Sequence, residues 1–158
     1  MRRHIVAFLL ATAVMVVLGS AAHSYFVQQA WSLAAGQADG TAAIPIPLAD
    51  RVSWAAHDLG GLLPSSYGAV TSIALLIALM IAGVVARFTG QRVIVFGAAG
   101  AFAIFTLFSV LRILLGTVGI FGARGVLGLA AQMAVGAVAG VVFAKLTQPD
   151  RDPRQRLE

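Results

Sequence analysis

The stretch "VIVFGAAGAFAIFTLFSVL", residues 93–111, runs for nineteen positions without a charged side chain. Residues 59–86 and 125–144 form two further uncharged stretches. A helix needs roughly 20 apolar residues to cross the hydrocarbon core of a bilayer, and each stretch is long enough. A soluble chain of 158 residues could not bury three helices that are apolar on every side. The sequence therefore predicts an all-α fold and a polytopic integral membrane protein.

Composition agrees with this prediction and excludes several classes of protein. Hydrophobic residues make up 59% of the chain and charged residues 11%, against about 45–50% and about 25% in soluble domains. The absence of cysteine excludes disulfides and thiolate metal sites. Positive residues fall near the ends of apolar stretches and form no basic patch, so no nucleic-acid partner is expected. No metal or cofactor is expected, and the predicted partner is the lipid bilayer.

Four transmembrane helices are predicted, at about residues 5–22, 67–86, 93–115 and 126–144. They form a single domain, residues 1–147, which includes an outer loop of residues 23–66. Residues 148–158 are polar and proline-broken, and we expect them to form a disordered cytoplasmic tail.

The first apolar segment has two interpretations. It resembles a secretory signal peptide, because a basic start and an apolar run precede the small residues Ser20 and Ala22. We prefer an uncleaved helix, because apolar and aromatic side chains continue as far as Trp31.

The distribution of charge predicts how the chain crosses the membrane. Eight cations precede the first span, flank the connection between the second and third spans, or follow the last span. Only Arg51, Arg112 and Arg124 fall on the other side. The positive-inside rule then places both termini in the cytoplasm of a bacterial inner-membrane protein. All tryptophan and tyrosine side chains lie in or beside the outer segment, where they would form an interfacial belt.

The outer stretch "LADRVSWAAHDLGGLLP", residues 48–64, predicts a short helix on the outer membrane surface. Asp50 is its expected N-cap, and an apolar stripe at helical spacing includes Val52 and Leu59. His57 and Asp58 form a candidate binding or general-base site. Adjacent residues point about 100° apart on a helix, however, so these two side chains do not form a catalytic pair by sequence alone.

Small residues at regular spacing predict where the helices pack together. "GTVGIFGARGVLG", residues 116–128, has a glycine at every third position, but it matches neither a phosphate-binding loop nor collagen. We interpret it as a hinge that leads into a packing face on the fourth span. The predicted packing residues on the second and fourth spans are Ala78, Ala82, Gly128, Gly136 and Gly140.

Three polar residues near or within the spans are further candidates for binding. Gln132 lies on the same face as the glycines and would bridge two helices or contact a substrate. Arg112 and Arg124 end or precede spans on the side that disfavours cations, so we expect an ion-pair clamp to Asp50 or Asp58, or an anion or lipid-headgroup site.

These features support three functional hypotheses, which we give in order of preference. The first is a structural or assembly protein that packs with itself or with a membrane partner and is not an enzyme. The second is a small transporter or channel for anions or lipid headgroups that uses Arg112 and Arg124. The third is a membrane enzyme with His57 and Asp58 at its site.

Overall fold

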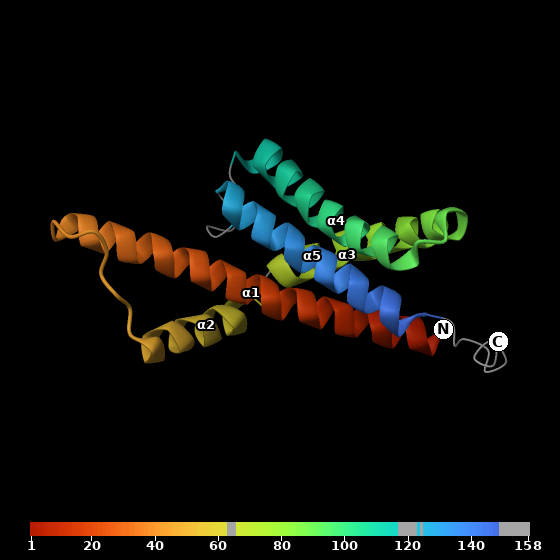
Figure 1. The fold of residues 1–158 in the computed structure, drawn as a ribbon, viewed down its shortest axis with the longest axis horizontal. Coiled ribbons are helices and arrows are strands. Elements are labelled where there is room, and N and C mark those ends of the chain that lie inside the picture. Colours follow the sequence, from red (N-terminus) through yellow and green to blue (C-terminus); the bar gives the residue numbers. More distant parts are fainter. Residues whose placement is uncertain (63–65, 117–122, 124, 149–158) are drawn as a thin grey trace, which may run out of the picture.

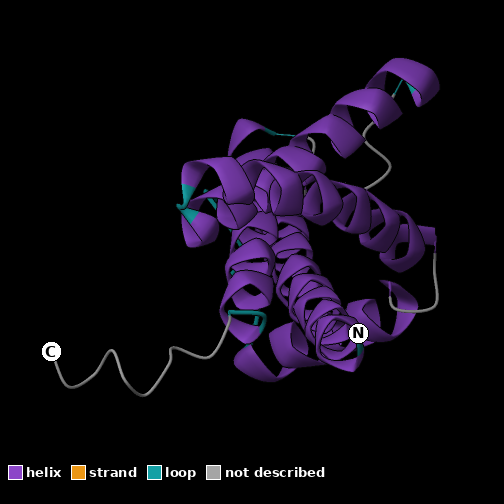
Figure 2. Cartoon of the chain, turned by 90° about the vertical axis from the view of Figure 1, so that its right-hand side faces the viewer, coloured by secondary structure: helices purple, strands orange, loops and turns teal. Residues whose placement is uncertain are grey.

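The structure is a computed structural model that describes residues 1–62, 66–116, 123 and 125–148. The described chain is helical apart from short connections (Figure 2). Its helices are α1 (Arg2–Ala38), α2 (Leu48–Leu62), α3 (Ser66–Thr89), α4 (Arg92–Leu115) and α5 (Val126–Leu146). Four of them, α1, α3, α4 and α5, are long and apolar enough to cross a membrane, and α2 is the short helix between the first two spans. The predicted all-α, multi-pass fold is confirmed.

The four long helices form a row in the order α1, α5, α4, α3. The contacts between α4 and α5, α3 and α4, and α1 and α5 are extensive, whereas α1 and α3 touch at few points. The N-terminus, the end of α5 and the connection between α3 and α4 lie at one end of the molecule (Figure 1). Arg3 fixes this end, because its Nε donates to the carbonyl oxygen of Leu146 at 2.9 Å. The bundle is therefore open on the side where α1 faces α3.

The prediction that an outer loop begins at residue 23 is wrong. Residues 23–38 are not loop but continue α1, which has 37 residues and a length of about 55 Å at the normal helical rise. Hydropathy marks only the part of a helix that suits lipid, and no proline or paired glycine interrupts this one. Two contacts, Arg3 with Leu146 and Gln132 with Gly19, fix the register between α1 and α5. The start of α5 thus lies level with about residue 25 of α1, and the rest of α1 projects about 20 Å further.

Helix α2 packs antiparallel against this projecting part of α1 (Figure 1). We call residues 24–62 the projecting hairpin. Its short helix begins at Leu48, after Pro47, so Asp50 lies in the first turn and is not the predicted N-cap. There its carboxylate still interacts favourably with the positive end of the helix. The predicted apolar stripe is only partly the packed face, since Leu59 is half-buried together with Arg51 and Asp58, whereas Val52 is exposed.

Candidate functional site

Several buried contacts of the projecting hairpin are polar. Asp58 accepts a hydrogen bond from Ser24 Oγ at 2.5 Å, and Gln28 Nε2 donates to the carbonyl oxygen of Arg51 at 3.0 Å. Ser32 Oγ donates to the carbonyl oxygen of Ile44. The α1 side chains that take part are spaced four residues apart, so they line one side of the helix. We call this row of contacts the polar seam.

The polar seam separates the two residues of the predicted site at His57 and Asp58. His57 is exposed, while its neighbour Asp58 turns inward to Ser24. His23 lies close enough to Asp58 for their charges to interact. A catalytic triad requires the serine to donate to the imidazole and the imidazole to the carboxylate. Ser24 instead donates directly to the carboxylate, and this bond links α1 to α2.

The predicted clamp is not formed by Arg112. Arg112 is exposed in the last turn of α4, and no ion pair joins it to Asp50 or Asp58 among the described residues. Asp58 accepts a hydrogen bond from Ser24, and Asp50 is exposed. Arg112 instead lines a cavity of about 190 Å³ with Ser109 and Gly125. Arg124 lies outside the described residues.

Gln132 links α5 to α1. Its side chain is 1% exposed, and its Nε2 donates to the carbonyl oxygen of Gly19 at 2.9 Å. A buried amide in an apolar bundle needs such a partner, because an unpaired polar group would cost free energy. Gln132 therefore forms a contact between α5 and α1.

The predicted packing residues occupy two different environments. Gly128, Gly136 and Gly140 are buried on α5, and the last two lie directly against the backbone of α4. On α3, Ala82 is buried and Ala78 is half-buried. The glycines let two helix backbones touch, which is the main source of close packing in lipid.

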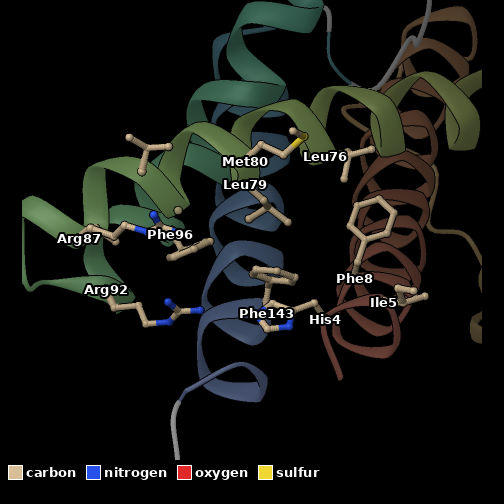
Figure 3. A pocket seen from close by; sticks show the side chains of 13 residues that line it. His4, Ile5, Phe8, Leu76, Leu79, Met80, Arg87, Arg92, Phe96 and Phe143 are labelled. Atoms are coloured by element: carbon tan, nitrogen blue, oxygen red, sulfur yellow. The ribbon is translucent and has the colours of Figure 1, made fainter. Parts of the chain in front are cut away.

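Between α1 and α3 lies a groove of about 600 Å³ that the sequence analysis did not anticipate. Leu76, Leu79 and Met80 line it from α3, and Ile5 and Phe8 line it from α1 (Figure 3). Phe96 of α4 and Phe143 of α5 lie between these two walls, with their ring centroids 5.4 Å apart. The groove exists because the row of helices does not close on itself, which leaves α5 and α4 as its floor.

One end of the groove is basic. His4, Arg87 and Arg92 line it there, and they come from the start of α1, the end of α3 and the start of α4. We call these three residues the basic rim. Arg87 is exposed, and Arg92 lies with its guanidinium carbon 4.7 Å from the centroid of the Phe96 ring. A cation over an aromatic face is held by the ring quadrupole, so Phe96 helps to keep Arg92 in place.

Arg92 has hydrogen-bond donors that are not all paired among the described residues. Its Nη2 donates to Thr147 Oγ1 at 2.6 Å, which ties α4 to the end of α5. Its Nε is buried and has no hydrogen-bond partner among the described residues. A buried guanidinium nitrogen without an acceptor is costly, so an oxygen-bearing ligand at the rim would be stabilised.

The residues that sequence reasoning missed left different signals. Arg87 and Arg92 were noted only as cations that fix topology, and nothing in one sequence shows that they share a groove with His4. The polar seam did leave a signal, because Ser20, Ser24, Gln28, Ser32 and Gly36 recur at every fourth position. That spacing marks one face of a continuous helix.

Comparison with known proteins adds no assignment. No protein-family model matches this chain, and no curated protein or solved structure is significantly similar to it. Any function must therefore be argued from the geometry itself.

Proposed function

We propose that this chain is a non-catalytic protein of the bacterial inner membrane that acts in assembly by pairing with a second copy of itself. Both termini would lie in the cytoplasm, which puts the projecting hairpin on the opposite side of the membrane. The contact element in this proposal is the outward face of α2.

One observation carries the proposal, namely the orientation of α2. This helix directs Arg51 and Asp58 toward α1 and leaves Leu48 and Val52 76% and 61% exposed. Ala56 continues the same exposed row at the next four-residue step. Apolar side chains gathered on one face beyond the bilayer indicate a surface that another molecule covers. Burying Leu48 and Val52 would contribute about 2–4 kcal/mol per copy.

A second copy fits this face better than a charged partner does. In a two-fold symmetric contact the same face of each copy meets the other, so a face with charges of one sign would repel itself. The row formed by Leu48, Val52 and Ala56 carries no charge. The polar residues of the interior also support a structural role, because Gln132, Ser24 and Gln28 are all engaged between helices.

Disulfide cross-linking tests the pairing cleanly, because the native chain has no cysteine. Val52→Cys should give a cross-linked dimer in native membranes under mild oxidation. Asp50→Cys is the matched control, because it is exposed on the same helix about 200° away around the axis. Equal cross-linking of the two variants, or a cross-link from Val52→Cys only to a different protein, would contradict self-pairing.

A transporter or channel for anions or lipid headgroups at Arg112 is the second candidate. It is favoured by the cavity that Arg112 shares with Ser109 and Gly125. It ranks lower because this cavity is small and Arg112 is exposed. Anion efflux from proteoliposomes that falls on Arg112→Gln substitution would support it, and the absence of any flux would exclude it.

A further inference from the structure

We propose that the groove between α1 and α3 is a binding site for one anionic phospholipid, with its phosphate at the basic rim and an acyl chain along the apolar walls. This site is separate from the face of α2 and does not depend on the proposed self-pairing.

The lining of the groove on α3 runs from Leu76 to Arg87, which is about 16 Å along a helix and gives an acyl chain a long apolar wall. The basic rim lies at the same end of the molecule as Arg3, near the N-terminus, and Leu146, at the end of α5. A lipid whose headgroup sat at the rim would therefore place an acyl chain along these walls.

The volume of the groove suits an acyl chain. The groove offers about 600 Å³, which falls within the range of small-ligand sites, about 300–1,000 Å³. A flexible chain can also follow the uneven surface formed by Leu79, Phe96 and Phe143.

The charge of the rim specifies an anionic headgroup. Arg87 and Arg92 line it together with His4, and the described lining residues include no acidic side chain. Guanidinium groups form paired hydrogen bonds to phosphate oxygens, and such charge-assisted bonds are stronger than neutral ones. A zwitterionic headgroup would bring its own cation to a site that already holds two arginines. A lipid with a net negative charge avoids this repulsion.

Arg92 is the centre of the proposed headgroup site. Its Nε is buried and has no acceptor among the described residues. Arg92 is also the first residue of α4, whose preceding residue, Gln91, makes no side-chain cap. The positive end of that helix therefore adds to the field at the rim. A phosphate oxygen at this point would accept a hydrogen bond from Arg92 Nε, which has no other acceptor among the described residues.

Native mass spectrometry of the protein in mild detergent tests the site directly. Phosphatidylglycerol or phosphatidylcholine with the same acyl chains is added in steps, and the bound fraction is measured. We expect one phosphatidylglycerol per chain, bound at least tenfold more tightly than phosphatidylcholine. Arg92→Gln should weaken phosphatidylglycerol binding about tenfold, because it removes charge-assisted hydrogen bonds. Lys145→Gln is the matched control, since Lys145 is an exposed cation at the same end of the bundle outside the groove.

A second pair of variants tests the acyl part of the site. Gly83 lines the groove and has room for a side chain there. Gly83→Phe should therefore displace both lipids, whereas Ile81→Phe, on the exposed side of α3, should displace neither. Arg92 also bonds Thr147, so Arg87→Gln, which alters an exposed arginine, repeats the rim test if the Arg92 variant does not fold.

Four results would overturn the proposal. The first is equal binding of the two lipids to the native chain. The second is an effect of both rim variants no larger than that of Lys145→Gln. The third is binding of inorganic phosphate that Gly83→Phe leaves unchanged, which would make the rim a site for a free anion. The fourth is a dimer that retains no lipid and whose contact covers the groove, because a second copy would then be its occupant.

Discussion

Gly100 of α4 and Gly136 of α5 meet backbone to backbone, and a Cβ atom added to either glycine would overlap the carbonyl oxygen of the other. Gly140 lies in the same way against the carbonyl oxygen of Phe96. Lipid gives helices no hydrophobic reason to associate, so such close contact supplies the dispersion energy that holds them. The crossing of α4 and α5 is therefore the tightest joint of the bundle.

Gly136→Ala should destabilise the bundle by about 1–3 kcal/mol, the usual cost of overfilling a packed site. The added methyl group would meet backbone, which cannot rotate away as a side chain can. The free energy of unfolding in mixed micelles, followed by circular dichroism, measures the effect. Gly83→Ala is the control, because an added Cβ there lies 4.0 Å from its nearest neighbour. If both variants unfold alike, the glycine joint does not determine the stability of the bundle.

Gln132→Leu should lower the free energy of unfolding by about 0.6–2 kcal/mol, the measured range for a hydrogen bond between helices in a membrane. The substitution keeps much of the side-chain volume but removes the bond from Nε2 to the carbonyl oxygen of Gly19. Thr106→Val is a suitable comparison, because Thr106 is an exposed polar residue of α4. Equal stability of the native chain and the Gln132 variant would show that this bond contributes nothing.

Ser24→Ala should loosen the projecting hairpin without unfolding the bundle. The hydroxyl of Ser24 donates to the carboxylate of Asp58, and a hydrogen bond to a charged group is worth about 1.5–3 kcal/mol. Amides of α2 should then exchange with solvent about tenfold faster or more, while those of α4 and α5 remain unchanged. Hydrogen exchange with mass spectrometry measures both.

The control for this experiment is Ser53→Ala, which alters an exposed hydroxyl on α2. Faster exchange in the Ser53 variant, or unchanged exchange in the Ser24 variant, would show that the polar seam does not hold the hairpin closed.

The sequence predicted the spans well because lipid imposes a simple rule. Uncharged stretches of sufficient length placed α3, α4 and α5 within about three residues of their observed ends. Every backbone group of a span must be bonded within the helix, so length and hydropathy almost determine the structure. The short helix before the second span was predicted from a different signal, an apolar stripe after an expected N-cap at Asp50, and the helix instead begins at Leu48.

The predictions failed where the chain leaves the hydrocarbon layer. Hydropathy placed the end of the first span at residue 22. The helix nevertheless continues to Ala38, and the buried face of this second part carries small and polar side chains. The inward orientation of Asp58 depends on its bond to Ser24, which lies 34 residues away in sequence. The groove depends on which long helices have few contacts with each other, here α1 and α3, and no periodicity within a single helix reports that.

The most direct test of the whole proposed arrangement is the accessibility of single cysteines to a membrane-impermeant maleimide in intact cells. Asp39 and Gln91 are both exposed, and they lie at opposite ends of the bundle. We predict that Asp39→Cys is labelled in intact cells and that Gln91→Cys is labelled only after the cells are lysed. Labelling of Gln91→Cys from outside, or recovery of the chain in the soluble fraction without detergent, would contradict a multi-pass protein with both termini in the cytoplasm.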